Sequence, residues 1–245
     1  MAILRNSATI PIYSNNNIGA YANAPLGKLA LNGNIVNSSS GTVSFRDKNY
    51  YSSISITSVA NISNSNFTIV GTSNGALITE TIAGPNSNTV LTNTLFDTII
   101  SITVSNNQVL SAFNIGSNSD VAFLAIYNPF NNYSYNEGRP IITILIINRD
   151  LTTTITSNSA TLYGVCGSDI GVIRKTDVSY NIGRNINLDV IAGGSSIITS
   201  ATLNSGLNLN PNYPYYGILF YIPYNVRDNT GGFTGQYFIE TAYTG

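Results

Sequence analysis

Few side chains in this sequence could perform acid–base or metal chemistry. The chain has no His, and its 11 Asp and Glu residues are spread thinly over 245 positions. A glycoside hydrolase needs only two carboxylates at the right separation in space, and Asp169, Asp177 and Asp189 form one loose group along the sequence. No carboxylates have the spacing of a calcium loop. We therefore expect these side chains in solvated turns and caps, and we predict no metal site.

The candidate nucleophiles lack groups that would activate them. A Ser triad requires a His base, which this chain does not contain. Cys166, the single Cys, is flanked by apolar residues and is predicted to be a buried small hydrophobic residue. The glycine-rich segment 193–196 has no Walker Lys or helix after it, which favours a hairpin turn over a phosphate loop. We expect no catalytic residues, no cofactor and no enzyme activity.

The composition predicts a neutral surface built from amides and hydroxyls. Only 9% of the residues are charged, against about 25% in ordinary soluble domains. Nucleotide bias that raised Asn and Ile would also raise Lys, yet Lys occurs only at Lys28, Lys48 and Lys175. The net charge of −1 gives little repulsion between molecules and favours association. The ten scattered Lys and Arg form no basic field, so we expect no nucleic-acid partner.

No segment is predicted to enter a membrane. The most apolar stretch, 141–147, is too short to span a bilayer as a helix. Residues 1–6 lack the basic start and long apolar run of a signal peptide. We expect synthesis and assembly in a host cytoplasm, with no membrane partner.

The elements that must position any site are predicted to be β-strands. In residues 28–118, short alternating runs are separated by turn signals, with Ile54 and Ile56 facing inward and Val59 as a third candidate. Asn74-Gly75 predicts a tight hairpin turn. The strands expected in this part cover 53–59, 66–71, 76–82, 89–92, 99–104 and 110–115.

The rest of the chain predicts a second set of strands. Residues 1–27 are expected to form an N-terminal arm, with breakers at 15–17 and 24–27 and one short strand at 9–13, which either frays or docks on a neighbouring molecule. Residues 116–120 are the best candidate boundary, which divides the chain into a β-sandwich at 28–118 and a second, jelly-roll-like sandwich at 119–245. One single large sandwich is the alternative. The later strands are expected at 121–127, 140–147, 160–165, 186–191, 196–202, 217–222 and 236–242.

The Tyr-rich segment 212–224 is the main candidate for a binding surface. Tyr combines a rigid apolar face with a polar tip, and both protein interfaces and sugar sites use this combination. Because the chain has no Trp, the usual platform for a sugar, we favour core packing and subunit contact over glycan binding. The candidate residues for the interface or for glycan binding are Tyr213, Tyr215, Tyr216, Tyr221 and Tyr224.

Residues 69–86 and 96–104 resemble a pattern in structural proteins of tailed-bacteriophage virions. There, a Gly-Thr hairpin leads into Thr-Glu-Thr-Ile and a Gly-Pro-Asn turn, followed by a strand that ends in Ser-Ile-Thr-Val. This chain has Thr79–Ile82, Gly84–Asn86 and Ser101–Val104 in that order. The resemblance covers under a third of the chain, includes no catalytic residue and implies a virion component.

We therefore expect an all-β, antiparallel, non-enzymatic structural protein of a virus particle. A capsid-surface, decoration or minor capsid role, with other copies and other virion proteins as partners, is the first hypothesis. A tail or fibre component, or an adhesin that binds host-surface glycan, is the second. A tailspike-like depolymerase ranks third.

Overall fold

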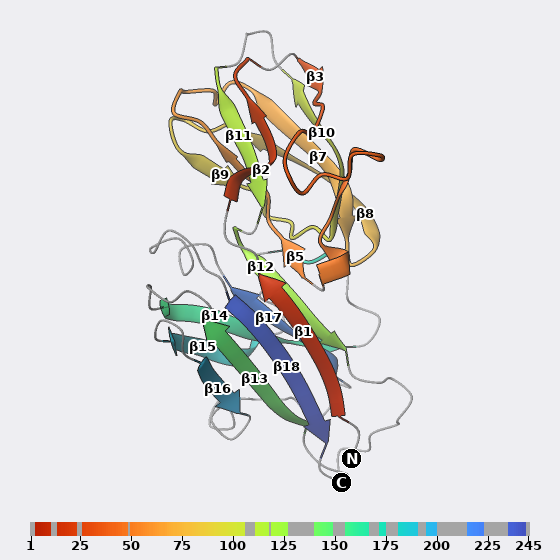
Figure 1. The fold of residues 1–245 in the computed structure, drawn as a ribbon, viewed down its shortest axis with the longest axis vertical. Coiled ribbons are helices and arrows are strands. Elements are labelled where there is room, and N and C mark those ends of the chain that lie inside the picture. Colours follow the sequence, from red (N-terminus) through yellow and green to blue (C-terminus); the bar gives the residue numbers. More distant parts are fainter. Residues whose placement is uncertain are drawn as a thin grey trace.

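A computed structural model gives the fold of the chain (Figure 1). Side chains are described for residues 14–23, 26–47, 50–105, 111–117, 119–122 and 172–174, and the backbone alone for the remaining strands and Lys48. The structure describes residues 3–10, 14–23, 26–48, 50–105, 111–117, 119–126, 140–148, 155–166, 172–174, 181–190, 195–199, 215–222 and 235–243.

Apart from Tyr51–Ser52, the strands described within residues 14–117 form two antiparallel sheets, which lie in the upper part of Figure 1. The first, here called the β2 sheet, has the order β2-β11-β6-β9, with β2 at Ser14–Tyr21, β11 at Phe113–Ser117, β6 at Ser55–Thr57 and β9 at Thr89–Leu91. The second, the β8 sheet, has the order β3-β10-β7-β8, and β4 also pairs with β10. Its strands are β3 at Gly27–Lys28, β4 at Val43–Ser44, β7 at Asn66–Ser73, β8 at Ala76–Ala83 and β10 at Thr98–Ser105.

The alternation of apolar and polar residues explains how these two sheets pack. In β7, every second residue from Phe67 to Ser73 is buried, and the residues between them are exposed or partly exposed. Such a period of two places one face of a strand toward the core. The Phe67 ring meets the Phe113 ring of the β2 sheet edge-on, with centroids 5.2 Å apart, and Tyr21 stacks on Phe113 at 5.0 Å. The β8 and β2 sheets therefore share one aromatic and aliphatic core, as in a β-sandwich.

The hairpin between β7 and β8 turns where the sequence predicts. Asn74 and Gly75 have φ values of 51° and 77°, as a two-residue hairpin turn with positive φ at both positions requires. The register runs without interruption from Ser73 opposite Ala76 to Asn66 opposite Ala83. The predicted turn and both of its strands are confirmed.

Two further antiparallel sheets lie in the lower part of Figure 1. The β18 sheet has the order β1-β18-β13-β16, and the β17 sheet has the order β15-β14-β17-β12-β5. Apart from β5 at Tyr51–Ser52, their strands are β1 at Ile3–Ile10, β12 at Val121–Ile126, β13 at Pro140–Asn148, β14 at Ile155–Cys166, β15 at Asn181–Val190, β16 at Ser195–Thr199, β17 at Tyr215–Ile222 and β18 at Gly235–Tyr243. All seven strands expected after residue 118 are present, with ends that differ by a few residues.

The lower strands pair in a nested order. The first of them, β1, pairs with the last, β18, over eight residues, and β12 pairs with β17. Likewise β13 pairs with β16, and β14 with β15. Counted along the chain, the first of these eight strands therefore pairs with the last, the second with the seventh, and so on inward, as in one long hairpin that is folded into two sheets. The chain forms the upper two sheets between β1 and β12.

A small cluster connects the upper and lower sheets. Strand β5 pairs with β12 as the edge of the β17 sheet, while Ser52 also bridges to Phe96. Nearby, Leu95 donates its backbone N–H to Ile173 O at 2.8 Å, and both side chains pack with Ala122 and Tyr51. The described part of the chain contains no α-helix, and its one helical turn is the 3-10 turn η1 at Arg46–Lys48.

Two local expectations are wrong. The run Asn15–Asn17 belongs to β2 and does not break it, because the buried Asn17 side chain exchanges two hydrogen bonds with Ser117 of β11, one from Asn17 Nδ2 at 2.8 Å and one from the Ser117 N–H at 2.9 Å. Val59 is 91% exposed. The alternation that buries Ile54 and Ile56 continues to Ser58, which is 4% exposed and donates its hydroxyl to Ala112 O, so Val59 falls on the opposite face.

The predicted N-terminal arm supplies strands to both the upper and the lower sheets. The described part of residues 1–27 contributes β1 and β2 and the start of β3, and Ile18 is fully buried. Whether this segment also reaches a neighbouring molecule stays a prediction, as does the division into domains at residue 118. Within the predicted boundary segment, Asp120 is buried and its backbone bonds to Ser53.

Candidate functional site

The predicted Tyr cluster belongs to β17 and its flanks. Tyr215 pairs with Cys166, and Tyr221 pairs with Thr161 on one side and Ala122 on the other. Tyr216 lies at a register shift between β14 and β17. The structure describes only the backbone of these three residues, and Tyr213 and Tyr224 lie outside the described residues. Their role in contact or in glycan binding stays a prediction.

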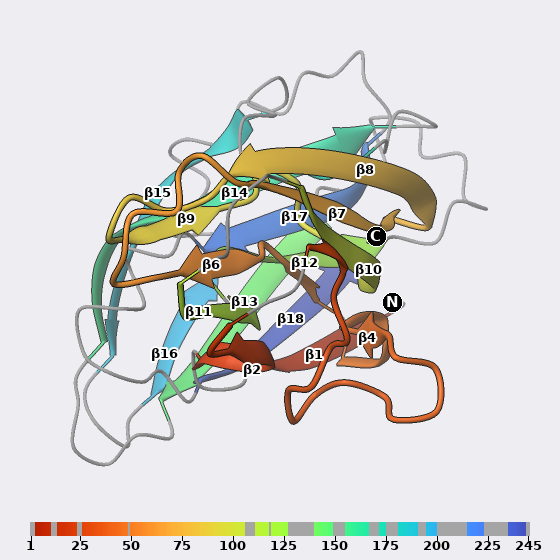
Figure 2. The ribbon, with the colours of Figure 1, turned by 90° about the horizontal axis from the view of Figure 1, so that it is seen from above.

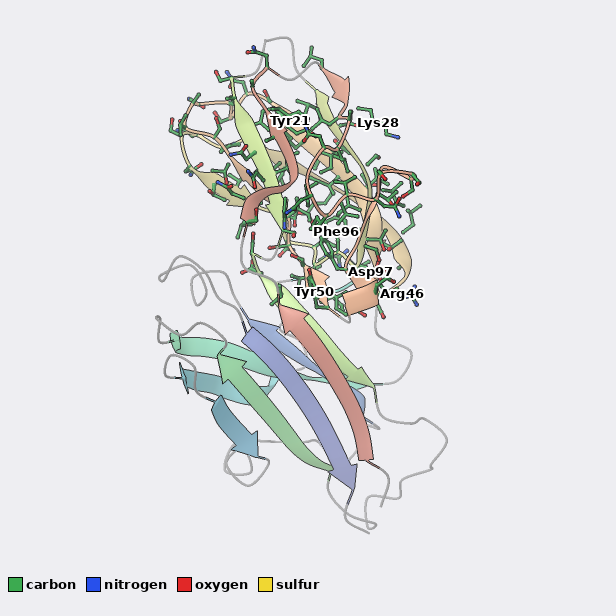
Figure 3. The ribbon with its side chains drawn as sticks, viewed as in Figure 1. Tyr21, Lys28, Arg46, Tyr50, Phe96 and Asp97 are labelled. Atoms are coloured by element: carbon green, nitrogen blue, oxygen red, sulfur yellow. The ribbon has the colours of Figure 1, made fainter. Side chains whose placement is uncertain are left out.

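The buried carboxylate of Asp97 holds the β7–β8 turn. Asp97 is 3% exposed and lies at the end of the upper sheets that faces β5 (Figure 3). Its Oδ2 accepts the backbone N–H of Gly75 at 2.8 Å, and its Oδ1 accepts the hydroxyl of Thr72. Its backbone also bonds to Thr72 and to Phe45. A carboxylate used in this way positions a loop.

Glu80 has a similar structural role on β8. Its two carboxylate oxygens accept consecutive backbone N–H groups, Asn93 at 2.6 Å and Thr94 at 2.7 Å. Charge-assisted bonds of this kind are among the stronger hydrogen bonds of proteins. The Glu80 carboxylate, the one charged group of β8, is therefore hydrogen-bonded to the neighbouring loop.

The other charged and metal-ligating side chains of the described residues form no cluster that could serve as a metal site. Among the residues with described side chains, no three His, Cys, Asp or Glu lie close enough together to hold a metal ion. No helix within the described ranges is long and apolar enough to cross a membrane. The exposed charges with described side chains are Lys28, Arg46, Asp47 and Arg174. Asp169, Asp177 and the segment 193–194 lie outside the described residues, and Asp189 and Cys166 are described by their backbone alone.

One surface of the β8 sheet carries no charged side chain on β10, β7 or β8, and its rows are interrupted only by a register shift of β10 between Ile99 and Ser101. Its outward-facing residues align in rows across β10, β7 and β8. The rows are Thr98–Thr72–Leu77, Ser101–Val70–Thr79, Thr103–Thr68–Thr81 and Ser105–Asn66–Ala83. We call these twelve residues the hydroxyl face, since eight of them carry a hydroxyl group.

The hydroxyl face is built to pack and to form neutral hydrogen bonds. Thr68 Oγ1 and Thr81 Oγ1 bond to each other at 3.0 Å across the strands. None of the twelve residues is charged; Glu80, between Thr79 and Thr81 on β8, is bonded to Asn93 and Thr94, and Lys28 lies opposite Thr103 at the far side of the sheet. Leu77, at the β8 side, is 70% exposed. Such a surface offers no acid, base or metal ligand, but it suits contact with another neutral surface.

Tyr21 is a partly buried phenol of the β2 sheet. Burial raises the pKa of its phenol to about 12, because an anion loses more hydration than the neutral form when it is buried. The hydroxyl donates to Ala30 O at 2.9 Å, and the ring packs on Phe113. Tyr21 therefore serves the core and the loop above it.

Comparisons with protein-family models, with curated proteins and with solved structures find no match to this chain. A candidate site on this chain is therefore supported by its geometry alone. Sequence reasoning did not single out the hydroxyl face, although Thr and Ser at alternate positions of 66–72, 77–83 and 101–105 are its signal.

Proposed function

We propose that this chain is a non-enzymatic structural protein of a virus particle, which acts through symmetric contacts with other copies and with other virion proteins. Within the particle we favour a capsid-surface, decoration or minor capsid position. The observation that carries the proposal is the hydroxyl face: an ordered, uncharged and partly apolar sheet surface that has capacity for contact and none for catalysis.

The pairing of the lower strands supports this proposal. Eight strands that pair first with last, second with seventh, third with sixth and fourth with fifth follow the plan of a jelly roll. Jelly rolls are common in viral capsid proteins and in lectins. We infer two sandwich units, in which 14–117 is inserted between the first and second strands of the jelly roll. Because one fold serves many functions, this analogy supports the assignment but does not carry it.

The treatment of charge is a second support. The described carboxylates Asp97 and Glu80 are used to hold backbone amides, so they add little charge to the surface. Proteins of near-zero net charge repel one another weakly and associate readily. A net charge of −1 over 245 residues fits a protein that is surrounded by neighbours.

Two measurements test the proposal. Sedimentation velocity of the whole chain between roughly 1 and 100 µM, a range that covers weak to moderate affinities, should show a closed oligomer of one size. Mass spectrometry of gradient-purified particles of a virus that encodes the chain should recover its peptides in stoichiometric amounts. A chain that stays monomeric and is missing from such particles would contradict the proposal.

The adhesin alternative makes a different prediction for the same material. If the chain binds glycan through 212–224, alanine at Tyr213, Tyr215, Tyr216, Tyr221 or Tyr224 should abolish binding on an array of host-surface glycans and leave the oligomer intact. Under the structural proposal, the same substitutions alter stability or the oligomer population, with about 2 kcal/mol or more lost at an interface hot spot.

A further inference from the structure

We propose that the open edge of β8 is a strand-addition site whose occupant is β8 of a second copy, paired antiparallel about a twofold axis through Thr79. This inference deepens the proposed function, since it rests on the association of copies and names the surface that would mediate it. The proposal rests on a difference among the edge strands of the β2 sheet and the β8 sheet.

Three of the four edges in these sheets are protected. Strand β9 is three residues long, and the edge beside β10 is made of β3 and β4, with two residues each. The long edge strand β2 is covered by the loop that follows it. Gly33 and Ile35 donate backbone N–H groups to Ile18 O and Asn17 O, and the Asn32 side chain bonds to both backbone groups of Ala20. Short strands and covering loops are the usual means by which proteins prevent edge-to-edge pairing.

Within the described residues, the fourth edge, β8, is neither short nor covered by a loop. It is eight residues long, and among the described strands only β7 pairs with it. In Figure 2, β8 lies on the side of β7 away from β10. Its sequence ALITETIA contains no Lys and no Pro, and its register with β7 has no bulge. Its one charged residue, Glu80, is bonded to Asn93 and Thr94.

The hairpin geometry shows which backbone groups this edge offers. A two-residue turn makes Ser73 and Ala76 a pair that exchanges both backbone hydrogen bonds. Pairs of this kind alternate along an antiparallel ladder, so the even-numbered residues of β8 bond to β7. The odd-numbered residues direct their backbone N–H and C=O groups to the open edge: Leu77, Thr79, Thr81 and Ala83.

A second copy of β8 fits this edge in one register particularly well. With Thr79 on the twofold axis, Leu77 faces Thr81 of the other copy and Glu80 faces Ile78. The register shifted by one pair would instead place Glu80 opposite Glu80, and like charges directly opposite each other are destabilising. A basic peptide would find on β8 only Glu80, whose carboxylate is already bonded to Asn93 and Thr94, whereas a second β8 matches the edge in both hydrogen bonds and side chains.

The first test removes the edge without disturbing the hairpin. Thr79→Pro deletes an N–H that points away from β7, so the β7–β8 ladder should remain, while addition of a strand at this position is blocked. Thr79→Val keeps the N–H and is the matched control. We expect sedimentation velocity to show at least a tenfold weaker association for Thr79→Pro and little change for Thr79→Val. Equal thermal melting of the dissociated forms would show that both variants fold.

The second test identifies the occupant. In the proposed register the two Thr79 Cα atoms lie about 5.5 Å apart, within disulfide reach, so Thr79→Cys should give a disulfide dimer under mild oxidation. Thr81→Cys is equally exposed, but its two copies would lie roughly 14 Å apart at the usual rise of a strand, and it should not cross-link. Wild type, which keeps Cys166, gives the background.

The outcomes separate this inference from the proposed function. A wild-type chain that never associates would overturn both. A wild-type oligomer that survives Thr79→Pro would overturn the role of β8 and leave assembly through another surface. Loss of the oligomer in Thr79→Pro without a Thr79→Cys dimer would mean that a different segment occupies the edge, which overturns the twofold pairing. A Thr81→Cys dimer in place of a Thr79→Cys dimer would overturn the register.

Discussion

The Asp97 carboxylate should be a main stabilising contact of the β7–β8 hairpin, and Asp97→Ala tests this. The substitution removes the acceptor for the Gly75 N–H at 2.8 Å and for the Thr72 hydroxyl. Hydrogen bonds to a charged group contribute about 1.5 to 3 kcal/mol each. Gly75 is exposed and Thr72 is partly exposed, so water can replace part of each bond. Two bonds at the lower end of this range predict a loss of about 3 kcal/mol in the free energy of unfolding.

Asp97→Asn separates the hydrogen bonds from the charge. The amide oxygen that this substitution introduces can accept the Gly75 N–H, and the new NH2 group can donate to the Thr72 hydroxyl, which also accepts. Neutral bonds contribute about 0.5 to 1.5 kcal/mol each, so Asp97→Asn should cost clearly less than Asp97→Ala. Thr72→Val removes only one of the two bonds and should cost about 1.5 kcal/mol. In the Asp97→Ala background, Thr72→Val should cost little more.

Urea unfolding followed by far-UV circular dichroism and Tyr fluorescence measures these differences. The chain has no Trp and 16 Tyr, so the Tyr signal is not masked. An Asp97→Ala variant within about 0.5 kcal/mol of wild type, the usual range of surface substitutions, would refute the reasoning. An Asp97→Asn variant as unstable as Asp97→Ala would show that the charge itself, and not the pair of hydrogen bonds, is what matters.

Three further predictions concern other parts of the described structure. Burial raises the pKa of Tyr21 to about 12, so its neutral form contributes fully to stability below the ordinary pKa of about 10, and this contribution is lost as the pH rises toward 12. Between these pH values, the free energy of unfolding should fall more steeply with pH for wild type than for Tyr21→Phe. A Cβ at Gly71 would lie 2.1 Å from Thr98 O and 2.8 Å from Phe96 Cδ1, so Gly71→Ala should destabilise the chain by about 3 kcal/mol, which thermal unfolding would detect. The oligomer should keep one size in light scattering between about pH 5 and 8, since no His titrates there, and a dissociation near pH 6 would contradict this.

Local patterns in the sequence were sufficient to predict most strands and one turn. Alternation in 66–82 predicts β7 and β8, and Asn74-Gly75 predicts the turn between them, because positive φ at two successive residues suits few other pairs. The apolar run 140–147 likewise predicts β13. These features depend on neighbours within a few residues, which the sequence itself displays.

The same patterns were less successful where a distant partner decides the outcome. Three successive Asn residues suggest a break in the chain, yet Asn17 lies within β2 because Ser117, a hundred residues away, bonds to its side chain. Val59 was placed inward with Ile54 and Ile56, yet Ser58 takes the inward position because its hydroxyl bonds to Ala112 O, 54 residues away, and Val59 is exposed.

The sequence by itself determined the chemical character of this protein: no His, little charge, abundant hydroxyls and amides, and strands throughout. Only the tertiary structure decided which strands are neighbours, and therefore which edges are covered. The alternation that predicts β8 also describes β2, but a loop bonds to the outer edge of β2, and among the described strands β7 alone pairs with β8. Side-chain alternation sets the faces of a strand, whereas its free edge depends on backbone hydrogen bonds to distant segments, which no local pattern encodes.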